Sequence, residues 1–354
     1  MRRGRWIWSD RAGRCGSFLR GCVLSALRLM GQVLVVRGGA IGDFILTLPA
    51  IQLIRASLPD PHIAVLGYRN VVDVAVEFGI VDEARSIEYG SMAQFFVPGA
   101  KLDEELSRWL GSFDLVVSYL YDPDGYFAGN IERCKVETFL QAIHKVDDDP
   151  SQGHAAGQLA RPLEQLAMFL ECPAPTLDFS RVPSRDASEL IVDSEKRWIA
   201  IHPGSGSPRK NWPVEKWFET CRALQAADDL VHFAIVTGEA DTESGEGLVS
   251  MLQTSGCRFT RWHARPLPEL AWALRKCALF LGHDSGISHL AAASGARSVL
   301  LFGPTDSCIW SPQNQAVRVI EAAAGGAGKM DDISSDEVIG AALEALAGYA
   351  KIQP

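Results

Sequence analysis

The stretch Q-V-L-V-V-R-G-G-A-I-G-D at residues 32–43 decides the fold class of this chain. Its first half is a short apolar run, which indicates a buried strand, and Gly38 and Gly39 end that run. Apolar residues recur at helical spacing over residues 43–58, and the apolar run H-I-A-V-L-G follows at 62–67. A strand, a glycine-rich loop, a helix and a second strand in this order predict the start of a parallel α/β sheet.

The same rhythm restarts in the second half of the chain. Short apolar runs predict strands there, and helical patterns lie between them. The predicted strands lie at 198–202, 232–237, 278–282 and 298–302. In the first half, the pattern over 154–171 predicts one long helix. We therefore expect two doubly wound α/β domains facing a central cleft, with ligands at the carboxyl ends of the strands.

The chain length supports two domains, because single cores stop growing near ~250–300 residues and this chain has 354. The stretch 172–189 is rich in Pro, Ser and Asp and is the predicted linker. We expect a poorly ordered extension at 1–31, an N-terminal domain at 32–187 and a C-terminal domain at 188–334. The predicted final helix, 335–354, is a candidate to pack back on the N-terminal domain.

Composition excludes several classes of protein. The sequence pI of about 5.4 argues against a nucleic-acid partner. The first 31 residues hold seven arginines and one acid, a local basic patch on an otherwise acidic chain. No apolar run is long enough to predict a membrane-spanning helix. The eight cysteines are scattered without a C-x-x-C pair, which indicates reduced thiols in a cytoplasmic protein rather than disulfides or a metal site.

Three glycines and an acid form the first segment that carries chemistry, R-G-G-A-I-G-D at 37–43. Gly39 and Gly42 let the backbone turn tightly and approach a ligand closely. Asp43 is expected at the start of the following helix, where an acid commonly serves as the N-cap. The segment lacks the spacings of a dinucleotide fold and of a P-loop. Taken alone, it favours a capping role for Asp43 over a catalytic one.

The second segment, H-P-G-S-G-S-P-R-K-N-W-P at 202–213, follows a predicted strand. It offers two hydroxyls, on Ser205 and Ser207, and two cations, on Arg209 and Lys210. Backbone N–H groups, hydroxyls and a cation are the groups that bind phosphate. A solvated turn is the alternative, but this density of anion-binding groups favours a phosphate site.

The third segment, G-H-D-S-G-I-S-H at 282–289, again joins a predicted strand to a predicted helix. Asp284, Ser285 and Gly286 would lie at the helix N-terminus, which favours a phosphate, and His289 lies along the same face. A capped helix with a core histidine is the alternative. A serine hydrolase is disfavoured because the serine lacks a G-x-S-x-G turn. A fourth segment, F-G-P-T-D at 302–306, offers Thr305 either to ligand or to a turn.

The four segments together resemble glycosyltransferase family 9, the ADP-heptose:lipopolysaccharide heptosyltransferases. The order and spacing of G-A-I-G-D, H-P-G…K-N-W-P, D-S-G-I-S-H and F-G-P-T-D agree over roughly residues 32–320. The resemblance implies the GT-B fold, with two Rossmann-like domains that bind the acceptor and the sugar nucleotide respectively. It also implies that an inverting, metal-independent enzyme transfers a sugar, most simply heptose, to lipopolysaccharide core or another glycan acceptor.

The resemblance assigns roles to individual residues. Asp43 becomes the general base, and Gly39 and Gly42 line the acceptor side. The donor and its phosphates would contact Ser205, Ser207, Lys210, Asp284, Ser285, Gly286, His289 and Thr305. No metal or other cofactor is expected, because the ADP-sugar donor is a substrate. The implied partners are that donor and a glycan or lipid-linked acceptor. We expect a cytoplasmic monomer with peripheral contact to the inner membrane.

Two alternatives stay open at this stage. A sugar-nucleotide epimerase could share the fold, and a non-catalytic homologue could keep only nucleotide-sugar binding. The segment Asp122-Pro123-Asp124 matches the D-x-D pattern of metal-dependent transferases. Because it follows a predicted strand and contains a proline, we interpret it as a turn.

Overall fold

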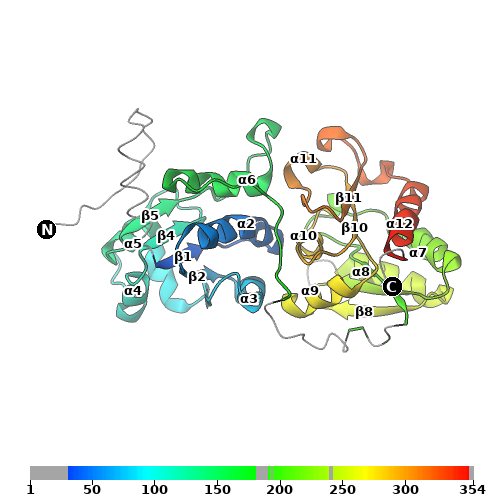
Figure 1. The fold of residues 1–354 in the computed structure, drawn as a ribbon, viewed down its shortest axis with the longest axis horizontal. Coiled ribbons are helices and arrows are strands. Elements are labelled where there is room, and N and C mark those ends of the chain that lie inside the picture. Colours follow the sequence, from blue (N-terminus) through cyan, green and yellow to red (C-terminus); the bar gives the residue numbers. More distant parts are fainter. Residues whose placement is uncertain (1–30, 181–189, 192, 194, 239–241, 351–354) are drawn as a thin grey trace. The chain divides into compact units, whose positions relative to one another are not determined.

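The computed structural model describes residues 31–180, 190–191, 193, 195–238 and 242–350 (Figure 1). The contacts within these residues divide them into two compact units. The first unit holds residues 31–40, Leu46–Asp147 and Ala155–Pro173. The second holds Ile41–Ile45, Asp148–His154 and the described part of Ala174–Pro354. The predicted extension at 1–31 lies almost wholly outside the described residues.

The first unit contains a five-stranded sheet in the order β3-β2-β1-β4-β5, and all its strand pairs are parallel. Apart from their end residues, the central strands β1, β2 and β4 are apolar and buried, as parallel strands covered on both faces must be. The strands are β1 (Gln32–Val36), β2 (His62–Gly67), β3 (Glu83–Ser86), β4 (Leu115–Ser118) and β5 (Thr138–Gln141). The helices are α2 (Ile41–Ser57), α3 (Arg69–Glu77), α4 (Glu104–Leu110), α5 (Tyr126–Arg133) and α6 (Ala155–Ala160).

The second unit contains a six-stranded parallel sheet in the order β11-β10-β9-β6-β7-β8. Its strands are β6 (Arg197–Ile201), β7 (Val231–Thr237), β8 (Phe259–His263), β9 (Leu279–His283), β10 (Ser298–Phe302) and β11 (Val317–Glu321). Its helices are α7 (Val214–Ala227), α8 (Thr242–Ser255), α9 (Leu267–Lys276), α10 (Gly286–Ala293), α11 (Ser307–Trp310) and α12 (Ser335–Ala350). The predicted fold class, two doubly wound α/β domains, is confirmed.

Each sheet has one point where the strand order reverses. In the first unit the chain runs from β1 outward to β3 and then returns to place β4 on the other side of β1. In the second unit it runs from β6 outward to β8 and then places β9 on the other side of β6. Ligands of open α/β sheets bind at such switch points, beyond the carboxyl ends of the two strands. The loops after β1 and β4, and those after β6 and β9, are therefore the candidate ligand-binding loops.

The suggestion that the final helix packs back on the first domain is wrong for the described part of that helix. Val338, Ala341, Ala342 and Leu346 of α12 are buried in the core of the second unit, which also contains Trp217 of α7. Those four positions recur at helical spacing, so they form one apolar stripe that a single partner surface covers. The predicted boundary at 187/188 lies outside the described residues, and the contacts divide the chain at Pro173 and Ala174.

The predicted helix over 154–171 is also wrong in its length. The α-helix α6 covers only Ala155–Ala160, and a 3-10 segment follows at Arg161–Leu166. Pro162 explains the break, because proline lacks the N–H of a helical hydrogen bond and its ring collides with the preceding turn. Ala167 then adopts a left-handed conformation, with φ of 57°, which ends the segment.

The described helices include none with the length and apolar character that crossing a bilayer requires.

Candidate functional site

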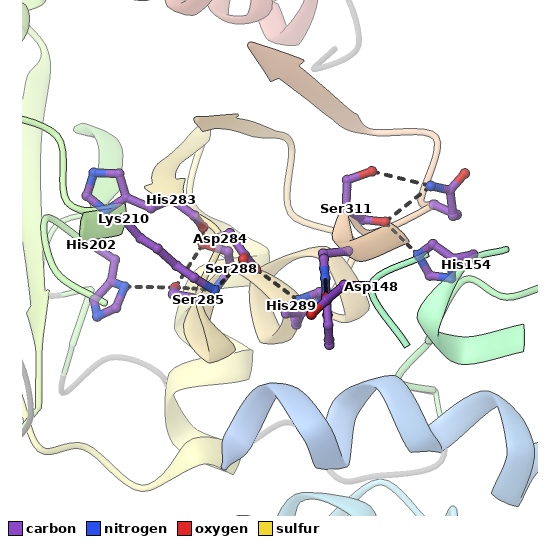
Figure 2. Close-up of polar contacts among 12 residues, drawn as sticks. Asp148, His154, His202, Lys210, His283, Asp284, Ser285, Ser288, His289 and Ser311 are labelled. Atoms are coloured by element: carbon purple, nitrogen blue, oxygen red, sulfur yellow. Dashed lines mark hydrogen bonds and ion pairs between the residues drawn. The ribbon is translucent and has the colours of Figure 1, made fainter. Parts of the chain in front are cut away.

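The loops after β6 and β9 bring together residues from two of the predicted segments. β6 and β9 are paired neighbours at the switch point, so the loops at 202–213 and 284–286 leave the same edge of the sheet. Lys210 Nζ donates to Asp284 Oδ2 at 2.6 Å. His289 Nε2 lies 3.8 Å from Asp284 Oδ1, which is too long for a hydrogen bond. Figure 2 shows Lys210, Asp284 and Ser285 side by side.

Asp284 is a buried carboxylate that stays ionised. Its residue is 7% exposed. Burial alone raises the pKa of Asp284, but His289 and Lys210 outweigh burial and hold that pKa at about 2. At neutral pH, the Asp284 carboxylate therefore holds the ammonium group of Lys210 at the N-terminus of α10.

Stability should depend on pH through Asp284. Because folding lowers its pKa from 3.8 to about 2, Asp284 stabilises the fold above pH ~4, and this contribution is lost as pH falls toward 2. Asp284→Asn removes that dependence. We expect the unfolding free energy of the wild type, relative to that of Asp284→Asn, to fall by about 1 kcal/mol between pH 6 and pH 3. Urea unfolding of both proteins across this range measures it, and a constant difference would contradict the assignment.

The N-terminus of α10 is capped as its sequence predicts. Ser285 is the N-cap, and its Oγ accepts from the backbone N–H of Ser288 at 3.3 Å. The same oxygen lies 3.1 Å from His202 Nδ1. The free N–H groups and dipole of a helix start attract an anion. The Lys210 ammonium lies beside this helix start, where it is paired with the Asp284 carboxylate.

His283 fixes the loop that carries Lys210, a role that the motif comparison missed. The backbone N–H of Trp212 donates to His283 Nε2 at 2.9 Å, and His283 Nδ1 lies 3.4 Å from the carbonyl oxygen of Gly204. One buried imidazole thus holds both ends of the loop. Burial and the neighbouring His202 lower the pKa of His283 to about 3, so the ring stays neutral and Nε2 remains an acceptor.

The two predicted hydroxyls of the same loop differ in their surroundings. Ser205 is buried, and its Oγ lies within hydrogen-bond distance of the carbonyl oxygen of Ser207 and of Asn211 Oδ1, at 2.8 and 2.7 Å, so that its single proton is donated to one of the two. Asn211 in turn donates to Ser244 Oγ at 3.0 Å. The Ser205 hydroxyl therefore shapes the loop. A direct contact of Ser205 or Ser207 with donor stays a prediction.

Asp43 lies in the first turn of α2, as expected for a residue that follows the glycine loop. The segment Ile41–Ile45 belongs to the second unit by its contacts. A Cβ atom built on Gly42 would lie 3.5 Å from Gly286 Cα and from His289 Cδ2. A Cβ on Gly286 would lie 2.8 Å from Gly42 N, closer than real Cβ contacts allow. Gly286 thus permits the start of α2 to contact the start of α10, whereas a Cβ at Gly42 would make only ordinary van der Waals contact.

The remaining predicted residues lie as follows. Gly39 has a φ of 102°, a conformation that favours glycine in the turn after β1. Thr305 precedes α11, and its Oγ1 is buried without a hydrogen-bond partner among the described residues. Asp306 is the N-cap of α11, so the turn role left open for this segment is the one seen for Asp306. Ligand contact by Thr305 stays a prediction.

His154 is a further residue near the site that sequence reasoning missed. Its Nε2 lies 2.8 Å from the carbonyl oxygen of Ser311 (Figure 2). Burial lowers the pKa of His154, Ser311 opposes this, and the charge of nearby His289 lowers the pKa further. No sequence spacing links His154 to 284–289, so only the fold could reveal the proximity.

The D-x-D segment forms a turn that caps α5. Asp122 accepts from the backbone N–H groups of Phe127 and Ala128 at 3.1 and 2.9 Å. This confirms the turn interpretation of residues 122–124. Within the described ranges, no group of three or more His, Cys, Asp or Glu residues is arranged to hold a metal ion.

Known proteins resemble this chain in sequence and in structure. The family model described as "Glycosyltransferase family 9 (heptosyltransferase)" matches residues 139–335. Lipopolysaccharide heptosyltransferase 3 of Escherichia coli (strain K12) is 23% identical over 312 residues, which are 78% of this chain and 83% of that protein.

Two solved structures share the fold. The glycosyl transferase family 9 protein of Veillonella parvula DSM 2008 has a TM-score of 0.71 at 19% identity, over 90% of this chain and 98% of that one. The ADP-heptose lipopolysaccharide heptosyltransferase II of E. coli has a TM-score of 0.70 at 17% identity, over 90% and 99%.

Two Rossmann-like units, each with a parallel sheet and one switch point, define the GT-B class of fold. Since the family model covers more than half of its length, this chain belongs to glycosyltransferase family 9. The predicted family, the GT-B fold and the prediction of a glycosyltransferase are confirmed.

Proposed function

We propose that this glycosyltransferase moves heptose from ADP-heptose to a lipopolysaccharide-core or related glycan acceptor, with inversion and without a metal ion. The observation that carries the donor half is the Lys210–Asp284 pair at the N-terminus of α10. The family, and the heptosyltransferases that resemble the chain, support the sugar and the acceptor. We further propose a monomer that works at the inner face of the cytoplasmic membrane.

In this proposal the donor diphosphate occupies the start of α10. The leaving ADP gains negative charge when the bond between the anomeric carbon and the phosphate oxygen breaks. Lys210 and the N–H groups at Asp284–Gly286 offset that charge, which is the task a divalent ion performs in other transferases. Asp284 holds Lys210 in place before donor binds, and His283 fixes the loop, so little reorganisation accompanies the reaction.

The second half of the proposal concerns Asp43. An acceptor hydroxyl attacks the anomeric carbon from the face opposite the leaving diphosphate, so the anomeric configuration inverts. The Asp43 carboxylate takes the proton of that hydroxyl as the new C–O bond forms. The contact between Gly42 and Gly286 supports this role, because it sets the first turn of α2 beside the helix start that would hold the diphosphate.

A thermal-shift panel of nucleotide sugars tests the donor. A ligand that binds only the folded state stabilises it by RT ln(1 + [L]/Kd), which is ~2.7 kcal/mol at a hundredfold excess over Kd. We expect ADP-heptose and ADP to raise the melting temperature in the presence of a chelator. UDP-, GDP- and CMP-sugars should leave it close to that of the free protein. A shift by UDP-sugars alone would contradict the proposed donor.

A further inference from the structure

An exposed pair of rings stands at the switch point of the first unit. Tyr121 follows β4, and its residue is 67% exposed. Its ring centroid lies 4.6 Å from that of the exposed His144, which follows β5, with 52° between the planes. We call Tyr121 and His144 the ring pair. The loop after β1, which contains Gly38 and Gly39, leaves the same edge of the sheet.

The backbone on both sides of Tyr121 is fixed. Gln141 Nε2 donates to the carbonyl oxygens of Ser118 and Leu120 at 3.1 and 3.0 Å. On the other side, the Asp122 carboxylate accepts from the N–H groups of Phe127 and Ala128 in the first turn of α5. The loop that carries the ring is therefore ordered before a ligand binds, which reduces the entropy lost on binding.

A buried cation holds His144. Arg37 is 4% exposed, and its Nη1 donates to the carbonyl oxygen of His144 at 3.3 Å. Its guanidinium carbon lies 5.5 Å from the ring centroid of Tyr119. On the opposite side of the loop after β1, Tyr68 lies within contact of Gly38, since a Cβ there would be 3.9 Å from Tyr68 Cε2. The exposed Tyr68 and the side chain of Leu120, the neighbour of Tyr121, thus both lie near Gly38.

The charge of this edge favours an uncharged ligand. The loops that leave the carboxyl ends of the five strands, residues 37–40, 68, 87–89, 119–125 and 142–147, contain two cations and four carboxylates. The cations are Arg37 and Lys145, and the carboxylates are Glu88, Asp122, Asp124 and Asp147. A net negative edge disfavours phosphate groups. The weakly positive C–H face of a sugar ring, in contrast, complements the negative face of an aromatic ring.

We propose that the ring pair binds an uncharged sugar ring of the acceptor by stacking on Tyr121. This inference rests on the proposed function, because it takes the acceptor to be a glycan. Tyr121 is the platform, and the sugar ring that it accepts carries no phosphate.

Two variants and a control test the platform. Tyr121→Ala removes the ring, Tyr121→Phe keeps its face, and Tyr89→Ala removes another tyrosine, 59% exposed, that follows edge strand β3. With strands ~4.8 Å apart, β3 lies ~14 Å from β4. Deacylated E. coli core oligosaccharide is used in two forms, one phosphorylated and one dephosphorylated. Binding of each form is followed by saturation-transfer NMR in the absence of donor. The acceptor KM is measured in a transfer assay.

We expect Tyr121→Ala to weaken binding and raise the acceptor KM about tenfold, with donor KM and melting temperature unchanged. Tyr121→Phe and Tyr89→Ala should behave as wild type, and the dephosphorylated oligosaccharide should bind at least as well as the phosphorylated one. An unchanged acceptor KM in Tyr121→Ala, an equal effect of Tyr89→Ala, or about tenfold tighter binding of the phosphorylated form would each overturn the inference. Failure of the wild type to transfer heptose at all would instead overturn the proposed function.

Discussion

Asp43→Asn is expected to lower the turnover number for heptose transfer by ~10²–10⁴-fold, because a positioned general base contributes a factor of that size. The change keeps the size of the side chain but removes its negative charge and, with it, its capacity to take a proton. Donor affinity, measured by calorimetry with ADP, should therefore match that of the wild type. Initial rates at saturating donor and acceptor measure the effect on turnover.

The chain offers a matched control for this variant. Asp336 is also an acid in the first turn of its helix, α12, and it is exposed. Asp336→Asn should lose only a small favourable interaction with the helix dipole and keep full turnover. If Asp43→Asn turned over as fast as Asp336→Asn, Asp43 would be no more than a favourable charge at the start of α2.

Lys210→Met is expected to lower kcat/KM by ~10²–10³-fold, the loss typical when one group that stabilises developing negative charge is removed. Its ammonium group is the cation that Asp284 holds at the N-terminus of α10. Because the leaving diphosphate carries more charge in the transition state than in the bound donor, kcat should fall as well as donor affinity. Steady-state kinetics with ADP-heptose as the varied substrate separates the two parameters.

Arg209 provides the control for Lys210. It is exposed, adjacent in sequence, and part of the same short 3-10 turn at Pro208–Lys210. Arg209→Met removes a positive charge from the loop without touching Asp284, so its kcat should stay near the wild-type value. Equal losses in the two variants would show that the general charge of the loop matters, and would count against a specific role for Lys210.

Much of the fold was predictable because both sheets are parallel and helices cover both of their faces. Buried strands appear in the sequence as continuous apolar runs. The observed β10 at Ser298–Phe302 begins and ends where the pattern predicts, and α12 begins at the predicted Ser335. Strand β8 was not predicted because Trp262 is its only buried residue. Its neighbours are partly buried or exposed, so the sequence shows no continuous apolar run. The packing of α12 was missed because periodicity locates an apolar stripe but not its partner.

The candidate site was predictable where its residues are adjacent in the chain. Ser285 at the start of α10 follows from local sequence, whereas the Lys210–Asp284 pair joins two loops that only the strand order brings together. His283 was missed because its two hydrogen bonds reach residues 71 and 79 positions away. Such contacts depend on the strand order, which no single motif reveals.

The most direct test of the account is transfer itself. Purified protein, ADP-heptose, a chelator and deacylated lipopolysaccharide-core oligosaccharide are incubated together and followed by mass spectrometry, with the anomeric configuration of the product determined by NMR. The account predicts that the oligosaccharide gains one heptose residue of inverted configuration while ADP is released. Isomerised donor without any transfer would indicate an epimerase, and unchanged donor and acceptor would indicate a binding homologue; either result would contradict the account.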